Sequence, residues 1–427
     1  MDPKSAVVGD ELDLAVVGGG AAGFFTALSC AEARPSSRIA IFEKGREVLS
    51  KVRISGGGRC NVTHACFAPR DLSTHYPRGQ KELIGPFHRW GPKDTMSWFQ
   101  HHEVPLKTED DGRVFPVSDR SESIIHCLLS QTQAANIEVR RGEPVSSVTS
   151  SDAGPFALHY PSGKKGSTQC LAITSGGLRG GKGADFLEAF GHEIVPPVPS
   201  LFTFKIKDPR IENLSGVSVA DARVTVRLPS SKERLDASGP LLITHWGLSG
   251  PGILKLSAWG ARLLHRQNYQ FELEVNWTKQ RHREDILIHL QSLRQSSPKK
   301  TVRKDPQFGI PARLWEALFL SLSPPNDLRW AHLPRPTATQ LAEELTAGRF
   351  LVTGKSTNKD EFVTCGGISR KEVHWKTMES RLIPSLYFAG EVLDVDGVTG
   401  GFNFQAAWTT GRIAGESIAH SLDAAEG

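Results

Sequence analysis

A glycine-rich turn constrains the fold of this chain more than any other sequence feature. Residues 12–17 (LDLAVV) form an apolar, β-branched run of the kind found in buried strands. Gly18, Gly20 and Gly23 follow it in the spacing G-x-G-x-x-G, and residues 24–33 have a helix-forming composition. In a strand–turn–helix unit these glycines allow a tight turn, close approach of a pyrophosphate and close helix packing. The alternative is a turn that only packs a helix on a strand.

A second strand completes the unit. Residues 38–42 (RIAIF) follow a Pro-Ser-Ser break, and Glu43 stands at their end, twenty residues after Gly23. An acid at this position accepts a hydrogen bond from a ribose hydroxyl. The pattern therefore predicts a βαβ unit that binds a dinucleotide.

A second glycine-rich segment spans residues 54–63. Gly56–Gly58 precede Arg59, and Lys51 and Arg53 add positive charge nearby. Three consecutive glycines bury no side chain and lose much backbone freedom on folding, so core packing does not explain them. We expect a loop that approaches a flat ligand or a phosphate, and the alternative is a flexible surface loop.

A third motif precedes the last predicted helix, which begins near residue 405. Gly390 and Glu391 end an apolar segment, and Gly400–Gly401 open the helix. This arrangement can place an acid on a ribityl hydroxyl and helix N-terminal amides against a flavin. Asp394 and Asp396 raise the alternative of a metal site, but the remaining ligands of a calcium loop are missing, so we predict no metal.

Residues 176–183 (GGLRGGKG) fit part of a phosphate-binding P-loop. The motif requires Ser or Thr after the lysine, whereas this chain has Gly183. A turn of the dinucleotide domain is the better interpretation.

Composition indicates a globular chain of 427 residues with 39% hydrophobic and 23% charged residues and a formal net charge of +5. No apolar run approaches the roughly 18 to 20 residues of a membrane span, and residues 1–13 lack a secretory signal pattern. The six cysteines include no C-x-x-C pair, which favours reduced thiols. We therefore expect a cytoplasmic protein without membrane contact.

Changes in composition and in hydrophobic pattern along the chain predict five segments. Residues 1–195 form the N-terminal part of the dinucleotide-binding domain, residues 196–277 a β-rich insertion and residues 278–348 a helical insertion. Residues 349–380 return to the β-rich insertion, and residues 381–427 complete the first domain.

The motifs together resemble the YhiN/BaiN-like family of FAD flavoproteins. The resemblance runs from about residue 12 to residue 419, and further strings carry it: residues 112–116, 191–192, 199–201, 244–251, 360–364 and 377–380. It implies an α/β fold with a Rossmann-like, glutathione-reductase-like FAD-binding domain, interrupted by a barrel-like β-rich insertion and a small helical insertion. The chain departs from the family at Thr174-Ser175-Gly176-Gly177, where Ala-Thr-Gly-Gly is usual, and at Cys365, where alanine is frequent.

The resemblance implies FAD as the cofactor and NAD(P)H as a transient reductant in a ping-pong cycle. The candidate cofactor-binding residues are Gly18, Gly20, Ala22, Gly23, Glu43, Lys44, Lys51, Ser55, Gly57, Gly58, Arg59, Asn61, Val145, Gly390, Glu391, Gly400, Gly401, Phe402 and Asn403.

The activity implied is reduction of a carbon–carbon double bond conjugated to a carbonyl, above all uridine to dihydrouridine in large-subunit ribosomal RNA. The candidate proton donors are Cys60 and then His245, with Cys365 and His64 behind them. One alternative is a small-molecule ene-reductase or oxidase for enones or steroid-like substrates, with Trp246, Trp259 and Phe402 as possible walls. A non-catalytic flavin- or RNA-binding protein is the other.

Basic residues concentrate in the helical insertion and could hold RNA phosphates. They are Lys279, Arg281, Arg283, Lys299, Lys300, Arg303 and Lys304. A solvated helix face is the alternative interpretation. The oligomeric state stays open.

Overall fold

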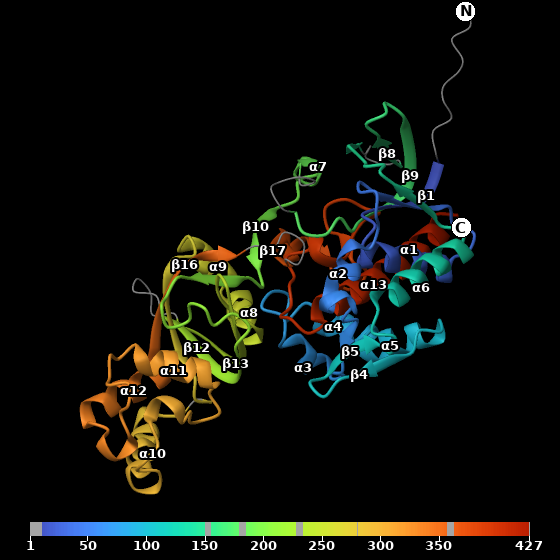
Figure 1. Cartoon of the computed structure of the whole chain (residues 1–427). Coiled ribbons are helices and arrows are strands. Elements are labelled where there is room, and N and C mark those ends of the chain that lie inside the picture. Colours follow the sequence, from blue (N-terminus) through green and yellow to red (C-terminus); the bar gives the residue numbers. More distant parts are fainter. Residues whose placement is uncertain are drawn as a thin grey trace, which may run out of the picture. The chain divides into compact units, whose positions relative to one another are not determined.

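The computed structural model describes residues 11–149, 155–178, 185–227, 234–279, 281–356 and 363–426. The chain divides into two compact units (Figure 1). Unit 1 comprises Met1–Val198 and Val363–Gly427, and unit 2 comprises Pro199–Phe362. No helix among these described residues is long and apolar enough to cross a membrane.

A parallel sheet forms the centre of unit 1. Its strands β6 (Glu138–Arg141), β2 (Ile39–Glu43), β1 (Glu11–Val17), β9 (Lys165–Ile173) and β20 (Leu386–Phe388) lie side by side in this order. The central strands are apolar and β-branched because helices and loops cover both faces of such a sheet. The carboxyl ends of β1, β2 and β9 therefore meet at one edge.

Helices α1 (Ala21–Ala33) and α13 (Phe402–Glu426) pack closely on one another (Figure 1). Glycines make this possible: a Cβ on Gly411 would lie 2.8 Å from the Ala22 carbonyl oxygen, and one on Gly415 would lie 2.3 Å from that of Thr26. The last helix thus joins the first βαβ unit, although about 370 residues separate them in the sequence.

Smaller elements complete unit 1. Strands β3, β5 and β4 form a separate sheet, β7 and β8 extend the main sheet beside β9, β18 and β19 extend it beside β20, and β10 pairs with β17. Their bounds, with the remaining helices, are α2 (Ser50–Gly58), β3 (Thr63–His64), α3 (Pro69–Ser73), α4 (Ile84–Arg89), α5 (Pro92–His101), β4 (Leu106–Thr108), β5 (Arg113–Pro116), α6 (Ser121–Ala134), β7 (Ser147–Thr149), β8 (Phe156–His159), α7 (Asp185–Ala189), β10 (Ile194–Ser200), β17 (Val363–Ile368), η4 (Arg370–Glu372), β18 (Val373–His374), β19 (Glu379–Ser380) and η5 (Gly390–Val392).

Unit 2 is a closed antiparallel barrel with helices packed against it (Figure 1). The strands close in the order β11-β14-β13-β12-β15-β16. The elements are β11 (Thr203–Ile206), β12 (Ser218–Arg227), β13 (Arg234–Thr244), β14 (Gly247–Ser249), α8 (Pro251–Trp259), α9 (Ala261–Arg266), β15 (Phe271–Asn276), α10 (Arg283–Ser296), η2 (Val302–Lys304), α11 (Ala312–Leu320), η3 (Trp330–His332), α12 (Arg335–Ala347) and β16 (Gly348–Ser356).

The predicted fold class, a Rossmann-like α/β domain interrupted by a barrel-like insertion and helices, is confirmed. The segment boundaries differ. Residues 363–380 belong to unit 1 and not to the β-rich insertion, because β18 and β19 pair with β20 at the edge of the main sheet. Residues 278–348 do not form a unit of their own, because buried side chains such as Trp315 and Leu341 share one apolar core with the barrel.

Candidate functional site

The turn between β1 and α1 contains glycines of two kinds. A Cβ on Gly18, where φ is 122°, would lie 2.4 Å from the Thr174 carbonyl oxygen, and one on Gly23 would lie 2.0 Å from that of Gly18. Contacts within the chain therefore require these two glycines. Gly20 has an ordinary φ of −98°, and apart from its chain neighbours no heavy atom of the described residues lies within 4 Å of a Cβ built there.

Open space thus lies at Gly20, directly before the first residue of α1. The first N–H groups of a helix have no acceptor within the helix, and the helix dipole adds partial positive charge there. This cradle suits the pyrophosphate of a dinucleotide.

Glu43 ends β2 beside this turn. One carboxylate oxygen accepts a hydrogen bond from the Gly19 N–H at 2.9 Å, and the other accepts from the Gly45 N–H at 2.7 Å. Two backbone bonds fix the carboxylate while each oxygen keeps a further lone pair. The half-buried group is thus held ready to accept from a ribose hydroxyl, with exposed Lys44 next to it.

Glu391 brings three distant segments together. Its carboxylate forms an ion pair with Lys51 and accepts from the Thr364 N–H at 2.7 Å. A Cβ on Gly177 would lie 3.1 Å from the same carboxylate and 2.2 Å from the Thr364 hydroxyl. The predicted dinucleotide residues on α2, the turn after β9 and η5 therefore meet. Half-buried Val145 lies just before β7, in a segment whose Glu143 N–H donates to the Glu43 carbonyl at 3.1 Å.

The segment predicted as a glycine loop is incorporated in α2. The helix is interrupted there: Ser55 has ψ of 151°, and Gly56 and Gly57 have φ of 58° and 70°. Gly58 follows with φ of 85°, and an added Cβ on Gly57 or Gly58 would meet no more distant atom of the described residues within 4 Å. Left-handed backbone explains the glycines, and their exposed backbone leaves room for a ligand.

Asn61 and Asn403 hold backbone around the start of α13. With its amide oriented to satisfy both ends, Asn61 accepts from the Gly401 N–H and donates to the Thr63 carbonyl, each at 3.0 Å. Asn403 accepts from the Gly397 N–H at 2.8 Å and donates to the Gly397 carbonyl at 2.9 Å. Both predicted cofactor residues therefore shape the loop before the helix.

Aromatic rings pack beside this loop. The Phe402 ring stacks on the rings of His75 and His64, with centroids 4.1 and 4.7 Å apart. His64 Nε2 lies 3.1 Å from the Asp111 carbonyl oxygen, so it carries the proton of the neutral ring. Burial lowers the pKa of His64, and the buried Nδ1 has no hydrogen-bond partner. A neutral ring whose only N–H is bound to a carbonyl is poorly suited to donate a proton to substrate.

The other proposed proton donors occupy different environments. Cys60 is fully buried, and burial raises the pKa of its thiol to about 12. Cys365 is also fully buried, in β17. His245 belongs to unit 2, where it is exposed in the turn between β13 and β14 and its ring centroid lies 4.2 Å from that of Trp246. Trp259, another predicted wall residue, is 42% exposed at the end of α8.

Arg59 is bound to acidic side chains. It pairs with Glu109 at 2.6 Å and Asp119 at 3.4 Å, and its guanidinium lies 3.9 Å from the centre of the Phe115 ring. Its Glu109 and Asp119 bonds raise the pKa of Arg59. The structure thus gives Arg59 acidic partners that the sequence pattern did not reveal.

The two aspartates of the third motif serve the fold. Asp396 is completely buried and paired with Arg78, and Asp394 lies 3.4 Å from Arg370. In the part of the chain that the structure describes, no group of three or more His, Cys, Asp or Glu side chains could hold a metal ion.

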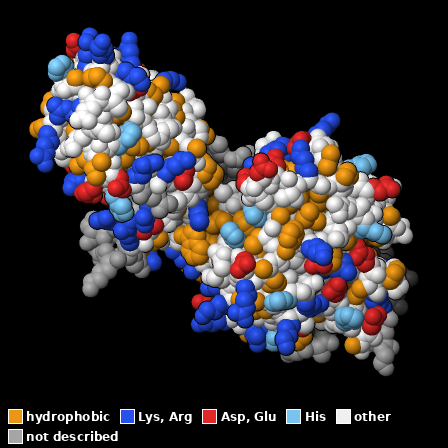
Figure 2. Space-filling model, turned by 90° about the horizontal axis from the view of Figure 1, so that it is seen from below, with side chains coloured by type: hydrophobic (Ala, Val, Ile, Leu, Met, Phe, Trp, Pro, Cys, Tyr) orange, Lys and Arg blue, Asp and Glu red, His pale blue; other side chains and the backbone are white. Residues whose placement is uncertain are grey.

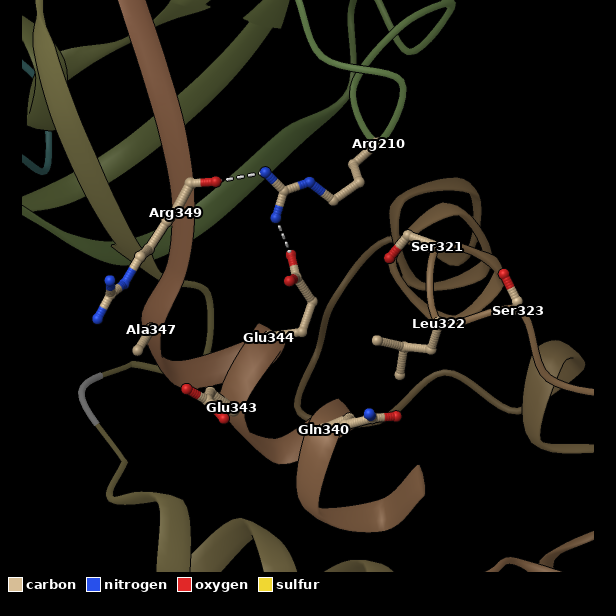
Figure 3. A pocket seen from close by; sticks show the side chains of 9 residues that line it. All are labelled: Arg210, Ser321, Leu322, Ser323, Gln340, Glu343, Glu344, Ala347 and Arg349. Atoms are coloured by element: carbon tan, nitrogen blue, oxygen red, sulfur yellow. Dashed lines mark hydrogen bonds and ion pairs between the residues drawn. The ribbon is translucent and has the colours of Figure 1, made fainter. Parts of the chain in front are cut away.

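Unit 2 contains a polar cavity of about 450 Å³ between α12, the turn after α11 and the start of β16 (Figure 3). Its Arg210 is already occupied, because it bonds Asp208, Glu344 and the Arg349 carbonyl and lies over Phe350. We assign no ligand to it. Residues 179–183 of the P-loop-like segment and residues 360–362 of a family string lie outside the described residues.

The predicted basic patch is divided. Lys279, Arg281 and Arg283 lie at the N-terminal end of α10, whereas Lys299–Lys304 follow its C-terminal end. The helix has 14 residues and is about 21 Å long, at roughly 1.5 Å per residue. Sequence proximity therefore does not produce a single surface from these seven side chains.

Comparison with known proteins adds independent evidence. Residues 12–417 match the family described as HI0933-like protein Rossmann domain. The chain is 29% identical over 418 residues to the ribosomal RNA dihydrouridine synthase of Escherichia coli K12, which covers 96% of this chain and 98% of the relative. It is 25% identical over 423 residues to the 3-dehydro-bile acid delta(4,6)-reductase of Clostridium scindens, covering 95% of this chain and 98% of that protein.

The solved structure of 3-ketosteroid delta1-dehydrogenase from Sterolibacterium denitrificans is similar in fold. It has a TM-score of 0.51 at 11% identity, covering 96% of this chain and 100% of that one.

Proposed function

Because the chain belongs to the HI0933-like Rossmann-domain family, we infer that it is an FAD-dependent oxidoreductase, and we propose that it reduces uridine to dihydrouridine in large-subunit ribosomal RNA. The observation that carries the substrate is the 29% identity, along 96% of the chain, to a ribosomal RNA dihydrouridine synthase. NAD(P)H is the proposed reductant.

The described residues fit FAD. The open space at Gly20 before α1 would receive the pyrophosphate, and Glu43 would accept from the adenosine ribose. The Lys51–Glu391 pair would hold the ribityl chain, and the loop held by Asn61 would face the flavin ring. When bound, FAD would supply hydride transfer.

The overall reaction adds two electrons and two protons to uracil, delivered as one hydride and one proton. A hydride goes to C6, a proton goes to C5, and NAD(P)H is oxidised to NAD(P)⁺. The chain must hold the uracil so that its C4 carbonyl is polarised and its C6 is presented, and must exclude oxygen from the reacting atoms. The sequence contains one complete G-x-G-x-x-G turn, so nicotinamide would visit and leave before RNA enters.

Reduction of an enone in a small molecule is the second candidate, favoured by the 25% identity to a bile acid reductase. It uses the same chemistry, because uracil C5–C6 and an enone are both double bonds conjugated to a carbonyl. The two candidates differ in the substrate that reoxidises the reduced enzyme.

The test uses purified holoprotein with NADPH and unmodified 23S rRNA transcribed in vitro. Mass spectrometry should find a dihydrouridine at a defined position, and the same position should lose it in cells that lack the gene. Absence of dihydrouridine in both experiments would refute the proposal. Anaerobic reoxidation by a steroid enone, but not by the rRNA, would establish the second candidate instead.

A further inference from the structure

The end of α10 in unit 2 gathers basic side chains from two segments far apart in the sequence. The Trp330 N–H donates to the Lys300 carbonyl at 3.1 Å, and the Val302 N–H donates to the Leu328 carbonyl at 2.9 Å. Thr301 and Arg329 form a β-bridge. These bonds bring residues 298–302 and 328–331 side by side.

Arg294 in the last turn of α10 joins the same place, because its guanidinium donates to the Ala331 carbonyl at 3.5 Å. The resulting surface, called here the α10 C-terminal patch, consists of Arg294, Lys299, Lys300, Lys304 and Arg329, all exposed. Figure 2 shows Lys and Arg side chains along the rim of the left-hand lobe, which is unit 2. Arg329 was not among the residues that the sequence singled out.

Few acids oppose this patch. Asp305 pairs with Lys300 at 2.9 Å and also accepts from the Trp330 indole N–H at 2.9 Å. Its carboxylate is therefore engaged by these two partners. Glu316 pairs with Arg303, next to Lys304, and exposed Asp327 is the other acid close in sequence. Among the described residues, Lys299, Lys304 and Arg329 have no carboxylate within ion-pair distance.

The group at the other end of α10 differs. Arg283 lies 3.5 Å from Glu284, and Asp285 follows in the same turn. The Arg281 guanidinium lies 5.6 Å from the centre of the Phe308 ring. Acids and an aromatic ring therefore engage this group, although it carries the same number of cations as the three unpaired residues of the patch.

We propose that the α10 C-terminal patch binds the phosphate backbone of the RNA substrate, an inference that rests on the proposed function. When exposed cations without acid partners bind phosphates, the counterions held around the RNA are released. This release makes binding favourable and dependent on the salt concentration. The patch carries no sequence information by itself, so it positions the RNA while base recognition occurs elsewhere.

The test compares two matched triple variants of the holoprotein. One carries Lys299→Gln, Lys304→Gln and Arg329→Gln, and the control carries Lys279→Gln, Arg281→Gln and Arg283→Gln. Both remove three positive charges from exposed positions in unit 2. Affinity for a fluorescent fragment of unmodified large-subunit rRNA is measured between 50 and 300 mM salt, and dihydrouridine formation is measured in parallel.

Each lost phosphate contact weakens binding roughly fourfold at 0.15 M salt, so the patch variant should bind about 50-fold more weakly. Its log–log salt slope should become shallower by about two, at roughly 0.7 per contact with single strands. The KM for RNA should rise similarly, while kcat and RNA-independent oxidation of NADPH stay as in the wild type. The control should bind within threefold of the wild type.

Equal loss in both variants, or no loss in the patch variant, would overturn the patch assignment and leave the proposed function standing. Binding that depends on the patch without any dihydrouridine formed would refute the proposed reaction and retain the RNA surface. The assignment would also be overturned if the wild-type protein bound anionic lipid vesicles but not RNA, and if the patch variant lost the binding to vesicles.

Discussion

The substitution Gly20→Ala tests the cradle at the start of α1 with little disturbance of the fold. Gly20 has φ of −98°, which alanine adopts, and in the described part of the chain the added methyl group would meet no atom within 4 Å beyond its own neighbours in sequence. At the position before the first helical residue, alanine caps a helix less well than glycine. This exchange lowers the free energy of unfolding by about 1 kcal/mol. Reduced freedom of the unfolded chain offsets this by about 0.4–1 kcal/mol. The melting temperature of the apoprotein should therefore stay close to that of the wild type.

FAD affinity should respond differently, because the methyl group would stand in the space proposed for the pyrophosphate. If the phosphate is displaced from two helix N-terminal N–H groups, two charge-assisted hydrogen bonds of at least about 1.5 kcal/mol each are lost. A loss of about 3 kcal/mol corresponds to roughly a 150-fold rise in the Kd for FAD. Titration of the apoprotein with FAD, followed by quenching of flavin fluorescence, measures it.

Two further glycines provide the controls. Outside its own helix, a Cβ on Gly85 in α4 also meets no atom of the described residues within 4 Å, so Gly85→Ala should leave FAD affinity unchanged. Gly23→Ala places a Cβ 2.0 Å from the Gly18 carbonyl oxygen and should destabilise the apoprotein itself, by about 1–3 kcal/mol. A Gly20→Ala protein that binds FAD within threefold of the wild type would show that the pyrophosphate does not lie at this turn.

Three further predictions follow from buried groups in unit 1. Asp396→Asn leaves the buried Arg78 charge without its counterion and should destabilise the protein by about 3–5 kcal/mol in urea unfolding; a change under 1 kcal/mol would contradict a structural role for the pair. Cys60→Ala should keep turnover within threefold, since the thiol is sealed from ligand, whereas a hundredfold loss with FAD bound would identify Cys60 as the proton donor. Burial raises the pKa of Cys30, Cys60 and Cys170 from 9.0 to about 12, so these thiols stabilise the fold below pH 9 and lose that contribution between pH 9 and 12. Stability should fall by roughly 1.4 kcal/mol per thiol at pH 10, and calorimetric melts at pH 8 and 10 that coincide would refute this.

Local patterns in the sequence predicted the β1–turn–α1 structure well. Leu12–Val17 and the glycines after it interact within one βαβ unit, so spacing alone determines which backbone atoms meet. The same holds for Glu43, which binds the N–H groups of Gly19 and Gly45. Long-range partners had no such signal: nothing in the sequence indicates that Lys51 pairs with Glu391, 340 residues away.

The basic residues show why adjacency in sequence is a weak guide to a surface. The spacing of Lys279 and Lys304 suggested one patch, but α10 separates them. Arg329 reaches the α10 C-terminal patch through the pairing of residues 328–331 with residues 298–302, and such a pairing depends on the fold of the whole unit. The unpaired state of Lys299 likewise depends on where acids lie in space.

A serine, a histidine and a glutamate show how geometry decides between chemistry and structure. His192 Nδ1 lies 2.9 Å from Glu372 Oε2 and its Nε2 lies 3.0 Å from Ser380 Oγ, which is the order of groups in a hydrolytic triad. Ser380 is only 4% exposed, however, and its Oγ accepts from the N–H groups of Leu382 and Ile383, both at 3.0 Å. An oxygen that already accepts two hydrogen bonds and is closed to solvent is not a nucleophile. The three side chains instead join the segment before β10 to η4 and β19. The chain leaves unit 1 after β10 and returns to it at β17, and these two strands pair with each other. The sequence strings around His192 and Ser380, which support the family resemblance, therefore lie at the base of this strand pair.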